Sequence, residues 1–183
     1  AAYDTGGWAG VDALYAKPPT STEQVLHPER YREGDEPQMI AAPPVTTTLG
    51  AGWQVLDADA LGELGLQLSS AQLAGTALGE AAAEGWGGDA YVVLRNTDTG
   101  ELALLLTTVW DTPAEASEFF RLYRALMAHR SGYVERVGSL VGELSTREWS
   151  NGTQWVRLEQ DGSSVTVAIA ASAETAALAA GAR

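Results

Sequence analysis

Residues 91–130 read YVVLRNTDTGELALLLTTVWDTPAEASEFFRLYRALMAHR, and this stretch decides the fold. Residues 91–95 predict a strand, TDTG at 97–100 predicts a turn, and the apolar run at 102–110 predicts a second strand. The second strand is apolar on both faces, which is typical of a strand in the middle of a covered sheet. The sequence therefore predicts an antiparallel hairpin inside the sheet.

The same stretch continues into a helix. Thr112 is the expected N-cap, Pro113 stands at the first helical position, and Glu115 completes a capping box. The helix is expected to run to about Arg130. Apolar residues at helical spacing form its buried stripe, namely Ala116, Phe119, Phe120, Tyr123, Leu126 and Met127.

Two turn sequences organise the C-terminal part. Asn-Gly at 151–152 and Asp-Gly at 161–162 are typical of two-residue hairpin turns, in which both central residues need positive φ. These turns separate three expected strands, at 146–150, 153–160 and 163–171. After them, Ser172 is expected to cap an Ala-rich helix.

Other stretches have weaker patterns. Residues 133–144 combine helical spacing with two glycines, so we leave their structure open. Between residues 53 and 85 we expect a short edge strand at 53–56 and a brief helix at about 60–68, capped by Asp59. A longer helix should follow, from Ser69 or Ser70 to a C-cap at Gly85.

Six of the seven prolines lie between Pro18 and Pro44, and this divides the chain into two parts. Residues 1–49 are expected to form one short helix and an extended, Pro-rich arm that lies over the rest of the chain. Residues 50–183 are expected to form an α+β domain. We expect a mainly antiparallel sheet of about five strands with helices packed on it.

The charge balance excludes several classes of partner. The 183 residues contain 11 Lys plus Arg against 24 Asp plus Glu, for a formal net charge of −13. Phosphate backbones would be repelled, so we expect no nucleic-acid partner.

No apolar stretch approaches the roughly 18 residues of a spanning helix, so we expect no membrane insertion. The chain has no cysteine, which excludes disulfides and thiolate chemistry.

Motifs for metal, nucleotide or serine-hydrolase chemistry are missing. His27 and His129 are the only histidines and lie far apart, so no HExxH spacing exists, and we expect no metal and no cofactor. The chain has no Walker loop and no GxGxxG. The segment at 138–142 has its serine one position too early for a GxSxG elbow. The sequence assigns no catalytic residue.

One segment, EGWGGDAY at 84–91, stands out as a candidate binding site. Its glycines permit positive φ and close backbone approach, and they flank a large amphipathic indole. We interpret it first as a helix C-cap followed by a tight turn. The alternative is a binding role for Trp86, Asp89 and Tyr91. A hairpin would bring Trp110 and Asp111 near Asp89, and all five residues would then share one rim.

Several separated motifs resemble one group of proteins. They are PPTSTEQVLHPERY at 18–31, LGE at 61–63, AEGWGGD at 83–89 and VWDT at 109–112. They resemble the C-terminal half of uncharacterised bacterial envelope proteins that look like metallopeptidases, with an HExxH helix in their N-terminal half. The resemblance spans about residues 1–130. It implies an accessory half of a longer precursor, with an upstream domain as partner and with the zinc-binding residues upstream of Ala1.

Three functions stay open. The first is a non-catalytic, ligand-contacting or scaffold module of a secreted or surface-attached bacterial protein; the composition suits an extracellular, envelope or cytoplasmic location. The second is a small enzyme in which Asp89 and Asp111 act as acid or base beside the indoles. The third is a small-molecule carrier with an apolar pocket lined by Leu106, Phe120 and Tyr123. The sequence identifies neither the ligand nor the oligomeric state.

Overall fold

The computed structural model describes residues 2–41, 44–141 and 144–181. Within these residues, seven strands form one sheet in the order β1-β2-β3-β7-β6-β5-β4, and each neighbouring pair is antiparallel. The strands are β1 (Trp53–Asp59), β2 (Trp86–Asn96), β3 (Leu102–Trp110), β4 (Val134–Val141), β5 (Leu144–Ser150), β6 (Trp155–Asp161) and β7 (Ser164–Ala170). The α+β class and the antiparallel sheet are confirmed. The expectation of about five strands is roughly right, since the sheet has seven.

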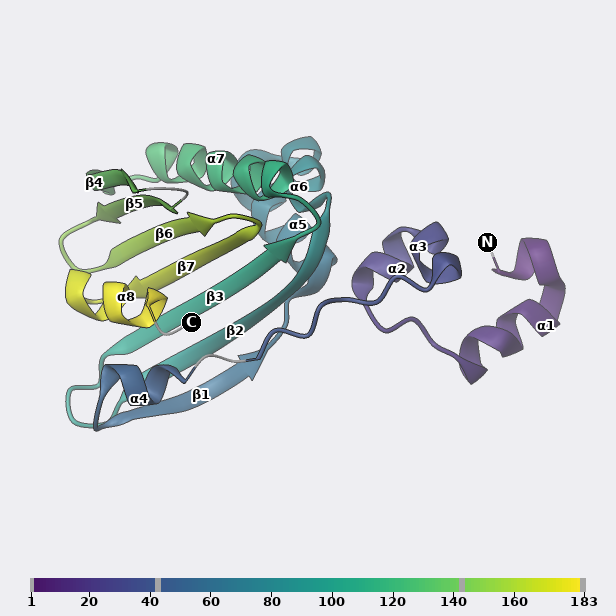
Figure 1. The fold of residues 1–183 in the computed structure, drawn as a ribbon, viewed down its shortest axis with the longest axis horizontal. Coiled ribbons are helices and arrows are strands. Elements are labelled where there is room, and N and C mark those ends of the chain that lie inside the picture. The colour runs from purple at the N-terminus through teal and green to yellow at the C-terminus, as the bar shows by residue number, and fades with distance from the viewer. Residues whose placement is uncertain (1, 42–43, 142–143, 182–183) are drawn as a thin grey trace.

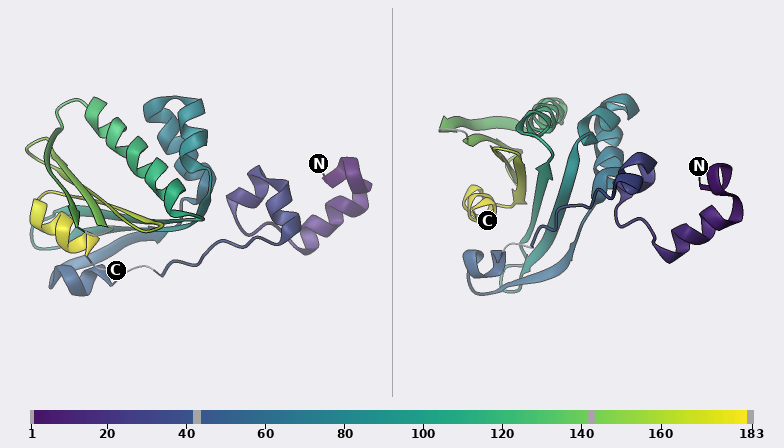
Figure 2. Two further views of the ribbon diagram at one scale, coloured as in Figure 1. Left: turned by 45° about the horizontal axis from the view of Figure 1, so that its top comes forward. Right: turned by 45° about the vertical axis from the view of Figure 1, so that its right-hand side comes forward.

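Helices cover both faces of this sheet (Figure 1). Those of the described chain are α1 (Ala2–Ala16), α2 (Thr22–Leu26), α3 (Pro28–Glu33), α4 (Val45–Leu49), α5 (Gly62–Ala74), α6 (Thr76–Ala83), α7 (Pro113–His129) and α8 (Ala173–Ala180). One face packs against α5, α6 and α7, and the opposite face packs against α4 and α8 (Figure 2). The expected capping box of α7 and the expected N-cap of α8 are confirmed, because Thr112 accepts from the amide of Glu115 and Ser172 accepts from the amide of Thr175.

Each face of the sheet has its own hydrophobic core. Alternation along β7 sends Val165 and Val167 toward α7, and Ala168 and Ala170 toward α8. The core on the α7 side centres on Trp110, whose ring centroid lies 4.9 Å from that of Phe119. A central strand that serves two cores must be apolar on both faces, which explains the sequence of β3.

The two edge strands of the sheet are β1 and β4. β1 pairs only with β2 in the described chain, and it is longer than the expected 53–56 strand. β4 occupies most of the stretch 133–144 that the sequence left open, while residues 142–143 lie outside the described residues. Its register with β5 shifts between Glu135 and Val137. Such a bulge breaks the alternation by which a strand is predicted.

The helical region before β2 divides at a different residue from the expected one. The break between α5 and α6 lies at Gly75, which has φ of +93°, and not at Ser69 or Ser70. Ser69 instead donates to the carbonyl of Gly65 inside α5. A Cβ on Gly79 would lie 2.6 Å from Cβ of Ala71, so glycine at this position allows α6 to pack closely on α5.

Residues 2–41, called the arm below, extend away from the β1 side of the sheet (Figure 1). The arm contains α1, α2, α3 and the extended residues 35–41, which we call the strap. It is therefore more helical than the expected Pro-rich segment. The last helix of the expected arm, α4, packs with the sheet, since Val45 is buried in the core on the α8 side. Residues 45–181 are called the body.

Candidate functional site

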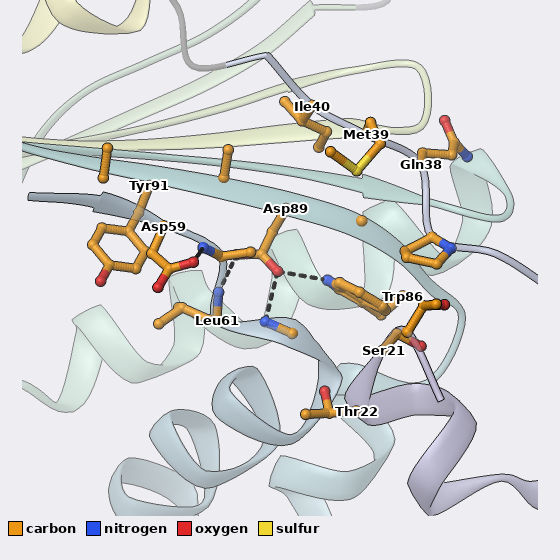
Figure 3. Close-up of a pocket in the computed structure, with 17 residues that line it drawn as sticks. Ser21, Thr22, Gln38, Met39, Ile40, Asp59, Leu61, Trp86, Asp89 and Tyr91 are labelled. Atoms are coloured by element: carbon orange, nitrogen blue, oxygen red, sulfur yellow. Dashed lines mark hydrogen bonds between the residues drawn. The ribbon is translucent and has the colours of Figure 1, made fainter. Parts of the chain in front are cut away.

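A pocket of about 460 Å³ lies where the arm meets the body (Figure 3). The arm contributes residues 20–22, at the start of α2, and residues 37–40 of the strap. The body contributes residues 58–62, at the end of β1 and the start of α5, together with Trp86 and residues 88–91 of β2. The pocket thus joins four separate segments of the sequence, two from the arm and two from the body.

Glycines in β2 let the strap approach the sheet closely. The amide of Gln38 donates to the carbonyl of Gly87 at 2.7 Å, and a Cβ on Gly88 would overlap the carbonyl oxygen of Gln38. Gly85 has φ of +75°, so the expected turn at the end of α6 is confirmed there. The expected tight turn at Gly87 and Gly88 is wrong, because both residues belong to β2, beside a bulge.

Asp89 is buried beneath the pocket, and both of its carboxylate oxygens accept hydrogen bonds. Oδ2 accepts from the amide of Leu61 at 2.7 Å, and Oδ1 accepts from the amide of Gly62 at 2.8 Å and from Nε1 of Trp86 at 3.0 Å (Figure 3). These amides begin α5, so Asp89 caps this helix from a distant part of the chain, strand β2. The expected cap, Asp59, instead accepts from the neighbouring amide of Ala60.

Tyr91 lies at the β1 side of the pocket among carboxylates. Its hydroxyl donates to Oδ2 of Asp57 at 2.8 Å. That hydrogen bond, burial and the negative charges of Asp57, Asp59 and Asp89 raise the pKa of Tyr91 above its ordinary value. This end of the pocket is therefore electronegative.

Trp110 and Asp111 are not among the residues that line this pocket, so the predicted common rim of five residues is not formed. Trp110 lies opposite Trp86 in the strand pairing, but it is buried in the core and donates from Nε1 to Thr108 at 2.9 Å. The carboxylate of Asp111 faces Arg30 of the arm at 3.2 Å. The structure brings together Trp86, Asp89 and Tyr91, and separates the other two.

The arm side of the pocket was missed by the sequence analysis. The capping pair of Ser21 and Gln24 predicts a helical turn, and Ser21 does accept a hydrogen bond from the Gln24 amide. No local pattern says which surface this turn contacts. The strap residues Gln38, Met39 and Ile40 carry no motif at all, and they reach the pocket through tertiary packing alone.

The three residues expected to line a carrier pocket belong to the hydrophobic core or pack against it. Leu106 and Phe120 are buried members of the core on the α7 side, and Tyr123 packs against that core. A second cavity of about 570 Å³ lies between α1 and the α2–α3 pair. Neither this cavity nor the pocket at the arm is lined by any of the three residues.

A cluster of charged side chains joins the arm to the body next to the pocket. Arg30 faces three carboxylates: Nη1 lies 2.5 Å from Asp35, Nη2 lies 3.2 Å from Asp111, and Nε lies 3.9 Å from Glu23. Nε2 of His27 lies 2.9 Å from Oε1 of Glu63 in α5. Of these contacts, Arg30–Asp111 and His27–Glu63 cross from the α2–α3 pair to the body, and the amide of Leu64 in α5 donates to Oγ1 of Thr22 at 3.2 Å across the same boundary.

Among residues 2–41, 44–141 and 144–181, no three Asp, Glu or His side chains gather closely enough to hold a metal ion. In the same part of the chain, no helix is both long enough and apolar enough to cross a membrane.

Comparisons with known proteins place the body in a family. No curated protein matches the chain significantly. The crystal structure of the extracellular domain of PknH from Mycobacterium tuberculosis is similar at a TM-score of 0.47 and 8% sequence identity, over 81% of this chain and 97% of that one. A family model described as "Domain of unknown function (DUF8575)" matches residues 46–180, from α4 to the end of α8. The chain belongs to this DUF8575 family.

Proposed function

We propose that this chain is a non-catalytic ligand-binding module, and that its site is the pocket between the arm and the body. The observation that carries the proposal is the pocket itself: two arm segments, residues 20–22 and 37–40, which we call the arm walls, and residues 58–62, 86 and 88–91 of the body line it together. Gly88 supports the proposal. Glycine weakens a strand because it has no side chain to pack, but at this position it leaves the space that the backbone of the strap occupies. A concave site with a few placed polar groups is the usual form of a small-molecule site.

The lining indicates what kind of ligand would fit. Its apolar part comes chiefly from Met39, Ile40, Leu61 and Trp86, and no lysine or arginine lines the pocket. Asp59 places a carboxylate at the electronegative end beside Tyr91. A small, mainly apolar molecule that is neutral or positively charged suits these walls better than an anion.

The engagement of the carboxylates supports a binding role over the enzyme alternative. Both carboxylate oxygens of Asp89 accept hydrogen bonds, from two amides at the start of α5 and from the Trp86 indole, so this side chain already has a structural role as the cap of α5. Asp111 is held by Arg30 outside the pocket. Neither carboxylate faces the pocket as an unengaged acid or base, which is what the enzyme alternative requires.

Two parts of the sequence interpretation stay predictions. One is the relation to metallopeptidase-like envelope precursors, together with an upstream partner domain. The other is a location outside the cell or in the cell envelope. The family match bears on neither, because its description assigns no function.

The test is a fragment titration of the full chain at about pH 5.5, followed in ¹H–¹⁵N spectra. Neutral and amine-bearing aromatic fragments should shift the Trp86 indole signal and the Gln38 amide signal. Ala58→Leu, which adds bulk to the pocket wall, should weaken these fragments about tenfold or more. The matched Ala114→Leu variant, exposed at the start of α7, should bind them normally. Fragments that bind Ala58→Leu as well as the wild type would contradict the proposal.

A further inference from the structure

We infer that the arm is a proton-operated latch, which is held on the body in acid and is released in mild alkali. The inference rests on the proposed function, because it describes how access to the pocket would be regulated. It is carried by the cluster of charged side chains where the arm meets the body, which we call the latch; two of its ion pairs, His27–Glu63 and Arg30–Asp111, cross between the two parts. The latch residues are Glu23, His27, Arg30, Asp35, Glu63 and Asp111.

The latch residues adjoin both arm walls of the pocket. Glu23 directly follows the wall residues 20–22, and Asp35 stands at the start of the strap. Inside the arm, the amide side chain of Gln24 donates to the carbonyl of Asp35, which ties α2 to the strap. The two walls should therefore move together when the latch opens.

On the body side, the latch includes the carboxylate of Glu63, and only one of its two oxygens has a polar partner among the described residues. The Glu63 side chain is only 7% exposed, and its Oε1 faces His27. Its Oε2 is buried and has no hydrogen-bond partner in the described part of the chain. A buried carboxylate oxygen without a donor is costly, and the neighbouring charges then decide whether docking is favourable.

Glu23 is the group on the arm that responds to pH. Its side chain is 6% exposed. It faces one cation, Arg30, and three carboxylates: Asp35 of the arm, Glu63 of α5 and Asp111 after β3. Burial raises the pKa of Glu23 to about 7, Arg30 opposes this rise, and the three carboxylates add to it.

The direction of the effect follows from the proton balance. The docked arm binds the Glu23 proton more tightly than a released, solvated arm, in which the carboxyl returns toward 4.5. Docking is thus fully favoured below this value and weakens as the pH rises toward about 7.

The absence of cysteine makes a direct test simple. Glu33→Cys on α3 and Glu118→Cys on α7 place two spin labels on exposed positions of the arm and the body. At about pH 5.5, electron–electron distance measurements should give one narrow distribution. At about pH 8.5, a broad and longer population should appear, and its growth with pH should be complete once the pH has passed about 7.

Two further variants separate the latch from a general effect of charge. Glu23→Gln keeps a neutral side chain at every pH, so its distribution should stay narrow at about pH 8.5. Glu84→Gln removes the same charge from an exposed position after α6 and should open like the wild type. An unchanged distribution in the wild type across this pH range would overturn the latch, and so would opening of Glu23→Gln to the wild-type extent.

These outcomes are independent of ligand binding. If the labels report no pH-dependent motion but fragments still bind at the pocket, the latch is wrong and the proposed function stands. If the arm opens with pH but no fragment binds, the latch stands and the proposed function is wrong.

Discussion

The body and the arm bury different kinds of side chain. In the body, buried tryptophans, leucines and valines form two cores on opposite faces of the sheet. In α1 of the arm no residue is buried, and Trp8 is 72% exposed. The buried residues of α2 are polar, namely Glu23 and Gln24. The shape of the body therefore depends on apolar burial, whereas the position of the arm depends on charges and hydrogen bonds.

This difference has consequences for energy and for pH response. Burying one large apolar side chain stabilises a fold by about 1.5–3 kcal/mol, and the value changes little with pH. A partly exposed ion pair contributes about 0–1 kcal/mol, and it responds to both pH and salt. We therefore expect the arm to detach at a much lower cost than the body unfolds. The pocket lies at the boundary between a stable region and a responsive one.

The largest expected effect comes from tryptophans on the two sides of this comparison. Trp110→Ala removes a side chain that is 1% exposed and packs on Phe119, and it should cost about 3–5 kcal/mol in urea unfolding. Trp8→Ala removes a ring that mainly contacts Tyr3, and it should cost less than about 0.5 kcal/mol. Similar costs for the two variants would show that the arm shares a core with the body.

A smaller effect is expected at the pocket floor. In the wild type, three N–H groups donate to the two carboxylate oxygens of Asp89. Asp89→Asn replaces one of these oxygens with an NH₂ group, so at least one of the three donors loses its acceptor, and the variant should lose about 1–3 kcal/mol of unfolding free energy. Asp59→Asn is the matched control, because Asp59 is exposed and caps only its neighbour; its cost should be under about 0.5 kcal/mol. Chemical denaturation of both variants measures this difference. An Asp89→Asn protein as stable as the wild type would refute the capping role.

The smallest expected effect concerns the contact between the strap and β2. Gly88→Ala should push the strap away, because the new Cβ would overlap the backbone of Gln38. In Gly87→Ala the nearest atom is Nε2 of Gln38 at 3.2 Å, the end of a flexible side chain that can turn aside. We expect Gly88→Ala to speed exchange of the Gln38 amide about tenfold, and Gly87→Ala to speed it much less. Equal exchange rates in the two variants would place the strap elsewhere.

The sequence predicts those parts of the fold whose signals are local. The capping box of α7 is one case: the hydroxyl of Thr112 accepts from the amide of Glu115, and the carboxylate of Glu115 accepts from the amide of Thr112. Each partner lies within one helical turn of the other, so the pattern can be read from four residues. The hairpin of β2 and β3 is predictable for the same reason.

The site was only partly predictable, because its contacts are not local. Asp89 caps α5 across 27 and 28 residues of chain, so the nearer Asp59 looked like the better cap. Arg30 reaches Asp111 across 81 residues. A single sequence contains no signal for such pairs, and for this reason Trp86, Asp89 and Tyr91 were found while the arm walls were not.

Native-state hydrogen exchange tests the division between the arm and the body most directly. At about pH 5.5, where the arm is docked, the Gln38 amide should exchange through a local opening whose free energy does not change with low concentrations of denaturant. Amides in the middle of β3 should exchange only through global unfolding, with a steep dependence on denaturant. If the Gln38 amide instead shows the same free energy and the same denaturant dependence as β3, the arm is an integral part of the folded unit and the account is wrong.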